Sequence, residues 1–157
     1  MLAENFKVVP VMNSANVSTG VDCDSINMKG FHKATFLFTF GAVTTDITIT
    51  PKSGADAGTK TTAVPSYYAA GGAVIGTAVA ASTASCDVLG AWTSTSTTVA
   101  LSAASNKFLV VEFDASDMTD GEEWLTLTVA AGSAGICHCV AVLEPRYTNN
   151  RSGTALA

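Results

Sequence analysis

Two cysteines flank a histidine near the end of the chain, as Cys137, His138 and Cys139. Thiolates and imidazoles are common zinc ligands, and neighbouring thiols also occur in redox centres. Side chains alternate between the two faces of a β-strand, so in a strand both cysteines point to one face and the histidine to the other. The three groups are therefore not expected to bind one metal ion.

The cysteines as a set also predict neither a zinc site nor a disulfide framework. Cα atoms two residues apart in a strand are separated by roughly 6.5 to 7 Å, near the upper limit for a disulfide. A zinc site would need Cys23, Cys86 or His32 as further ligands, and the cysteines lack the C-x-x-C spacing of zinc ribbons. We expect free, mostly buried thiols and no cofactor.

Acidic residues gather between positions 112 and 123, which hold six of the thirteen acids and no base. Clustered carboxylates raise the question of calcium, but their spacing misses the alternate positions of an EF-hand loop. Asp114 and Asp117 suit turns in which a carboxylate accepts backbone N–H bonds, and Asp120 with Gly121 is a turn dipeptide. The segment predicts a solvated turn without a metal.

The motifs of common enzymes are absent. His32 and His138 are the only histidines, and the sequence holds no G-x-S-x-G elbow, H-E-x-x-H pair or P-loop. His32 has no adjacent acid to orient it as a general base. Paired carboxylates of the glycosidase kind meet only in the fold, so they stay an open alternative. The expectation is a protein that is not an enzyme.

The composition of the chain limits the kinds of partner that it is expected to bind. The chain has 157 residues, enough for one domain, of which 13% are charged, with a net charge of -5. Its eight Lys and Arg residues are scattered, so nucleic acid is not an expected partner. The Ala-rich stretch 69–81 is too short and too interrupted for a membrane helix, and residues 1–7 lack a secretory signal. We expect synthesis in a cytoplasm, no membrane contact and a surface suited to other proteins.

Alternating and β-branched residues predict strands along the chain, and no segment has a helical period. The predicted strands cover residues 33–40, 46–50, 61–68, 92–99, 108–113, 124–129 and 136–143. Pro51 should end the second strand because it cannot donate to a ladder, and residues 69–85 predict a long loop with a short strand. The last strand should be buried on both faces. The pattern predicts an all-β fold, an antiparallel β-sandwich or a barrel.

The chain is predicted to divide into an N-terminal arm (1–21), a β-sandwich domain (22–147) and a short C-terminal tail (148–157). Apolar residues of the arm are candidate contacts with a partner: Phe6, Val8, Val9 and Val11. Packing of the arm on its own sandwich is an equal alternative, because added strands and self-packed strands use the same physics.

Three segments occur in an order that is found in a known class of proteins. They are residues 28–36 leading to 40–41, residues 106–118 with 120–121, and residues 141–147. Together they resemble small structural proteins of tailed bacteriophages, in which a similar first strand, a strand with an acidic turn, and a closing strand ending in Arg-Tyr follow one another. The resemblance covers roughly residues 25–147.

The resemblance implies a jelly-roll-like β-sandwich on the exterior of the virion, in the family of head decoration or cement proteins. Such proteins bind the joints between subunits of the major capsid protein, often as homotrimers, and need no reactive site. Arg146 and Tyr147, at the rim of the sandwich, are then further candidate contacts. Placement at the neck or tail of the virion is an alternative, because jelly rolls serve at many virion positions.

A second hypothesis is a carbohydrate-binding β-sandwich displayed on a virion or a cell surface. Four aromatic residues would then be candidates for stacking on a sugar: Trp92, Trp124, Tyr67 and Tyr68. The plain alternative is that the tryptophans belong to the core.

Overall fold

The computed structural model describes residues 5–71, 75, 86–102, 104–147 and 153–157. Strands dominate this part of the chain, and a 3-10 turn, η1 (Ala115–Asp117), follows one of them. The strands are β1 (Lys7–Asn16), β2 (Val21–Asp22), β3 (Ile26–Asn27), β4 (Phe31–Phe40), β5 (Ile47–Gly54), β6 (Thr62–Ala63), β7 (Ser66–Ala70), β8 (Thr93–Ser96), β9 (Val99–Leu101), β10 (Phe108–Asp114), β11 (Trp124–Ala131) and β12 (Ile136–Pro145). None of the described residues forms a helix long and apolar enough to span a membrane.

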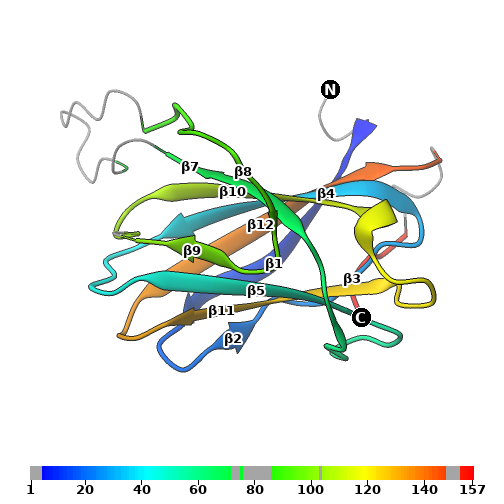
Figure 1. Cartoon of the computed structure of the whole chain (residues 1–157), viewed down its shortest axis with the longest axis horizontal. Coiled ribbons are helices and arrows are strands. Elements are labelled where there is room, and N and C mark those ends of the chain that lie inside the picture. Colours follow the sequence, from blue (N-terminus) through cyan, green and yellow to red (C-terminus); the bar gives the residue numbers. More distant parts are fainter. Residues whose placement is uncertain (1–4, 72–74, 76–85, 103, 148–152) are drawn as a thin grey trace.

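Two antiparallel sheets face each other as a sandwich (Figure 1). Sheet A has the order β1-β12-β4-β10-β7-β8. Sheet B has the order β2-β11-β5-β6, with β3 also paired to β11 and β9 to β5. This arrangement confirms the predicted all-β sandwich and excludes the alternative of a closed barrel.

The strand order is that of a jelly roll. The chain crosses between the sheets from β1 to β2, from β3 to β4 and back from β4 to β5, and crosses again between β10, β11 and β12. Strands β1, β12, β4 and β10 make one four-stranded half, and β2, β11, β5 and β6 make the other. Strands β7 and β8 extend the first half beyond β10.

The core lies between the two sheets and is rich in phenylalanine on the sheet A side. Phe36 and Phe38 of β4 and Phe113 of β10 are fully buried, because every second residue of these strands faces inward. The rings of Phe36 and Phe113 meet edge to face, with centroids 5.5 Å apart and planes at 89°. This geometry is a preferred one for aromatic pairs and adds a side-chain contact between the paired strands β4 and β10.

Pro51 lies inside β5, so the prediction that it ends this strand is wrong. On one side, Pro51 pairs with Leu127 of β11. On its other side, β5 changes partner at this point, from β9, which pairs up to Ile49, to β6, which pairs from Lys52. The missing N–H of proline therefore falls where the ladder is interrupted in any case.

The first segment of the chain belongs to the sandwich from residue 7 onward. Strand β1 pairs antiparallel with β12 as the edge strand of sheet A, which differs from a separate arm and agrees with the self-packed alternative. Of the predicted tail, residues 153–157 also pack on the sandwich: Ala155 is buried, its carbonyl oxygen accepts the Asn27 N–H at 2.9 Å, and Leu156 bridges to Ile26. Most of the predicted loop at 69–85 lies outside the described residues.

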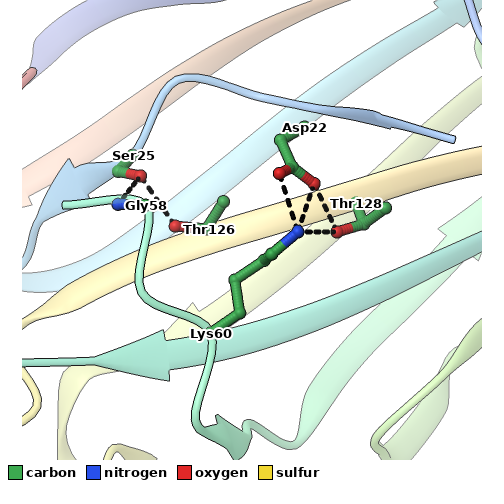
Figure 2. Close-up of polar contacts among 6 residues, drawn as sticks. All are labelled: Asp22, Ser25, Gly58, Lys60, Thr126 and Thr128. Atoms are coloured by element: carbon green, nitrogen blue, oxygen red, sulfur yellow. Dashed lines mark hydrogen bonds and ion pairs between the residues drawn. The ribbon is translucent and has the colours of Figure 1, made fainter.

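A cluster of polar side chains centred on Lys60 binds β2, the edge strand of sheet B, to its neighbour β11 (Figure 2). Lys60 Nζ lies 2.7 Å from Asp22 Oδ2 and 3.4 Å from Thr128 Oγ1. Thr128 Oγ1 also donates to Asp22 Oδ1. The lysine thus joins the loop after β5 to β2 and β11.

A second cluster nearby fixes the same loop to β11 (Figure 2). The hydroxyl groups of Ser25 and Thr126 are 2.7 Å apart and buried, and Ser25 Oγ accepts the Gly58 N–H at 2.9 Å. These buried polar groups satisfy one another, so the loop after β5 is fixed over this part of sheet B.

Candidate interaction surface

The structure separates the four predicted contact residues of the N-terminal segment. Val9 and Val11 are 3% and 2% exposed and belong to the core, so they are not available to a partner. Val8 points the other way and is 46% exposed. Phe6, just before β1, is half-buried. The alternation of a strand explains the split, since neighbouring residues face opposite sides.

Arg146 and Tyr147 lie at the rim of sheet A, directly after β12. The backbone N–H of Arg146 donates to the Gly30 carbonyl oxygen at 2.9 Å, and its Nε donates to the Phe31 carbonyl oxygen at 2.9 Å. Arg146 therefore secures the start of β4. Tyr147 is 73% exposed, which keeps it available to a partner.

The outer face of sheet A carries apolar side chains on four neighbouring strands. In one row across the sheet, Pro10 pairs with Val140, Val140 with Leu37, and Leu37 with Val110. In the next row, Val8 pairs with Val142. Val110 is buried, at 7% exposed. We call the remaining set the apolar outer patch: Val8, Pro10, Leu37, Val140 and Val142.

Sequence reasoning missed this patch because it treated the closing strand as buried on both faces. That prediction is wrong for β12. Its inward residues are buried, but Val140 and Val142 are only half-buried, and Ile136, on the same outward side, is 42% exposed. The signal in the sequence is the unbroken apolar run of residues 139–143, which a strand with one solvated face does not need.

The edge of sheet A next to this patch is guarded against strand addition. Pro10 stands within β1, and the register between β1 and β12 shifts twice, between Pro10 and Met12 and between Met12 and Ala15. Proline removes a donor and bulges twist an edge, and natural sheets use both to block edge-to-edge pairing. The face is therefore more open to a partner than the edge.

Three of the four cysteines form a buried cluster. Cys23, Cys137 and Cys139 are at most 3% exposed, and all are free thiols. Burial, with the neighbouring Cys23, raises the pKa of the Cys137 thiol to about 12. Burial and the two neighbouring thiols also raise the pKa of Cys139. In the described part of the chain, no three His, Cys, Asp or Glu side chains converge as a metal site.

His138 points to the opposite face and meets a serine of the edge strand. The Ser14 N–H donates to its Nδ1 at 3.3 Å, and Ser14 Oγ lies 3.1 Å from its Nε2. Since Nδ1 accepts a hydrogen bond, the neutral ring carries its proton on Nε2 and donates it to the hydroxyl. This is the reverse of the hydrogen bond that a general base needs to activate a serine.

Glu122 and Glu123, at the end of the acidic segment, each bind a partner elsewhere in the chain. Glu122 accepts hydrogen bonds from Ser53 and Thr62, at 2.6 and 3.0 Å. Glu123 pairs with Lys29 at 3.1 Å. Their oxygens are thus committed to structure, in agreement with the solvated turn that the sequence predicts.

Asp114 caps the 3-10 turn of this segment. Its Oδ1 accepts hydrogen bonds from the backbone N–H and the hydroxyl of Ser116, at 2.8 and 2.7 Å. These two bonds lower the pKa of Asp114, and the charges of Lys33 and His32 act in the same direction. The carboxylate is therefore ionised and held in place at neutral pH.

A groove of about 500 Å³ lies at the end of the outer face of sheet A where β4, β7 and β10 meet. Its lining residues are Lys33, Tyr67, Trp92, Glu112, Asp114, Ser116 and Asp117. Trp92 is 49% exposed and Tyr67 38% exposed. The other two aromatic candidates lie elsewhere: Tyr68 packs against the core, and Trp124 is on β11 of sheet B.

Comparison with known proteins shows a similar fold in a solved structure. No protein-family model and no curated protein matches the chain. Among solved structures, the chain is similar to the crystal structure of SPBc2 prophage-derived protein YomS, with a TM-score of 0.50 and 11% sequence identity. The match covers 88% of this chain and 93% of that chain. At this identity the likeness concerns the fold, which the two chains share over nearly their whole lengths.

Proposed function

We propose that the chain is a structural protein of a bacteriophage particle that binds a shell subunit through the outer face of sheet A. The apolar outer patch carries this proposal, because its neighbouring apolar side chains share one rigid face and remain partly open to solvent. Val8 and Pro10 are exposed, and the other three side chains are half-buried. The prophage origin of the structurally similar protein supports a phage context.

Within that role, the finer proposal is a head decoration or cement protein. It would bind at joints between major capsid subunits on the capsid exterior, as a homotrimer. Three features support it: a rigid sandwich, an edge strand guarded against open-ended pairing, and the exposed Tyr147 at the rim. The proposal requires no cofactor, no enzymatic activity and no contact with nucleic acid or membrane.

The contact is proposed to use side chains of the face and not the backbone of the edge. Val8, at 46% exposed, marks the border of the patch nearest the edge. A lysine there would place a charge in an apolar contact, where an unpaired charge is strongly unfavourable. The change should leave the fold intact, because this side chain already faces solvent.

The experiment is cosedimentation of the purified protein with phage particles assembled without it. The native chain should bind to saturation, and Val8→Lys should lower the affinity roughly tenfold. Val88→Lys is the matched control, because Val88 is 59% exposed but lies outside the patch. Equal binding of the native chain and Val8→Lys would show that the outer face of sheet A is not the contact. Failure of the native chain to bind would contradict the proposed role in a phage shell.

A further inference from the structure

We propose that the groove lined by Tyr67 and Trp92 binds a neutral saccharide. The proposal does not depend on attachment to a phage shell, because the groove lies at one end of the outer face and Val8 lies across the sheet on β1. Two of the four aromatic residues predicted from the sequence to contact a sugar line this groove. The structure places polar side chains beside them that the sequence analysis did not associate with them.

The two aromatic side chains supply the apolar part of the site. Trp92 and Tyr67 are among the most exposed large hydrophobic side chains of the described residues, and both line one groove. Two exposed rings in one concave site form an apolar surface that a ligand can cover. A sugar offers such a ligand, since its C–H groups form apolar patches between its hydroxyls.

The polar lining suits hydroxyl groups, which both donate and accept hydrogen bonds. Glu112 and Asp114 offer acceptor oxygens, and Lys33 offers donors beyond the one that it gives to Glu112 at 2.7 Å. The Ser116 hydroxyl donates its hydrogen to Asp114 and so offers a further acceptor. These groups are held in place before a ligand arrives, because Lys33 and Thr35 hold Glu112, and Ser116 holds Asp114.

Strand pairing explains why the groups meet. Glu112 of β10 pairs with Thr35 of β4 on one side and with Tyr67 of β7 on the other. Asp114, two residues further along β10, faces the same side and pairs with Lys33. Trp92 directly precedes β8, which pairs with β7. Four of the lining residues, Lys33, Tyr67, Glu112 and Asp114, therefore lie on paired strands.

The charges of the lining define the class of saccharide. One cation, Lys33, stands against three carboxylates, Glu112, Asp114 and Asp117. The resulting negative field repels sulfated, phosphorylated and sialylated glycans and leaves neutral sugars as the favoured ligands. The groove volume of about 500 Å³ is within the range of small-molecule sites.

The same groups are arranged for binding and not for hydrolysis of a glycosidic bond. A glycosidase needs one carboxyl group with a raised pKa as its general acid. The pKa of Asp114 is lowered by its bonds with Ser116, and Glu112 is ion-paired with Lys33. Asp114 is thus not prepared to deliver a proton at neutral pH.

The first test is a glycan array that presents neutral and anionic glycans to the full-length chain. Neutral glycans should be bound and sialylated or sulfated ones should not. Trp92→Ala and Tyr67→Ala should each weaken binding of the best array ligand roughly tenfold. Tyr147→Ala is the matched control, because Tyr147 is exposed but lies outside the groove.

The second test uses intrinsic fluorescence, since the chain has two tryptophans. In Trp124→Phe, Trp92 is the sole tryptophan, and titration with maltotriose, cellotriose, mannotriose and chitotriose should change its emission in a saturable way for at least one of them. In Trp92→Phe, the remaining Trp124 should not respond. If either variant fails to fold, calorimetric titration of the native chain with the same sugars measures binding without a substitution. The proposal is overturned if no neutral glycan binds the native chain at millimolar concentration, or if binding survives Trp92→Ala unchanged.

Discussion

Lys33 on β4 and Glu112 on β10 form an ion pair at 2.7 Å across two neighbouring strands. Their side chains are 40% and 26% exposed, so this pair in the lining of the groove is partly buried. The pair links β4, which carries Phe36 and Phe38, to β10, which pairs with β7 at Tyr67. Its strength can be compared with that of a more exposed pair in the same molecule.

A double-mutant cycle with Lys33→Met and Glu112→Gln should show a coupling of about 1 kcal/mol in urea unfolding. The control is Lys29 with Glu123, whose side chains are 74% and 40% exposed. This second pair is more strongly screened by water and should show a coupling of only a few tenths of a kcal/mol, on the order measured for exposed pairs. A larger coupling energy for Lys29 and Glu123 than for Lys33 and Glu112 would contradict the stronger stabilisation expected of the partly buried pair.

Asp22 should make the stability of the sandwich depend on pH in the acid range. Burial raises the pKa of Asp22, but hydrogen bonds from Lys60 and Thr128 and the charge of Lys60 outweigh it, so the pKa lies below its usual value of 3.8. The contribution of this carboxylate is therefore fully present above the unfolded-state pKa and is lost as the pH falls through the folded-state pKa.

Urea midpoints measured from neutral pH down to about pH 2 test this. Asp22→Asn should flatten the loss of stability below about pH 4. Lys60→Met should have a similar effect, because it removes the main partner that lowers the pKa. A native-like acid profile in both variants would contradict the assignment.

The buried thiols should resist modification in the folded protein. Cys137 has a pKa of about 12, so almost none of it is thiolate near pH 8, and Cys139 is protected in the same way. With dithiobis-nitrobenzoate, the native chain should release colour only from Cys86, which is half-exposed. All four cysteines should react after unfolding. Rapid reaction in folded Cys86→Ser would show that the closing strand opens easily.

Gly54, at the end of β5, should not tolerate a side chain. A Cβ there would overlap the Thr59 carbonyl oxygen, which belongs to the backbone of the loop that carries Gly58 and Lys60. Gly54→Ala is expected to lower the free energy of unfolding by about 1 to 3 kcal/mol, as overpacking does elsewhere. Gly153→Ala is the control, since its Cβ meets nothing within 4 Å. An unchanged urea midpoint for Gly54→Ala would mean that the loop shifts freely.

The strands with strong local signals could be predicted from the sequence. β10, β11 and β12 match the predicted strands at 108–113, 124–129 and 136–143 to within a few residues at their ends. Their β-branched and alternating residues favour a strand whatever its partner. The jelly-roll order agrees with the resemblance to phage structural proteins, although no local pattern encodes it.

What could not be predicted depends on pairing between distant segments. β1 became a strand because β12, more than a hundred residues later, supplies its ladder, and Pro10 within it reads locally as a strand breaker. The groove is similar: Tyr67, Trp92 and Glu112 are separated by 20 residues or more in the chain and meet through the pairing of β7 with β8 and β10. The sequence nominates the two aromatics, but only the fold distinguishes them from Tyr68 and Trp124.

The central claim, that the outer face of sheet A attaches this sandwich to a phage shell, is tested most directly by cryo-electron microscopy of the particle whose genome encodes the chain. The predicted result is density for the jelly roll on the outside of the shell, with Val8 and Val142 in the contact and sheet B facing solvent. A particle without this density, or a sandwich attached through sheet B with the apolar outer patch in water, would contradict it.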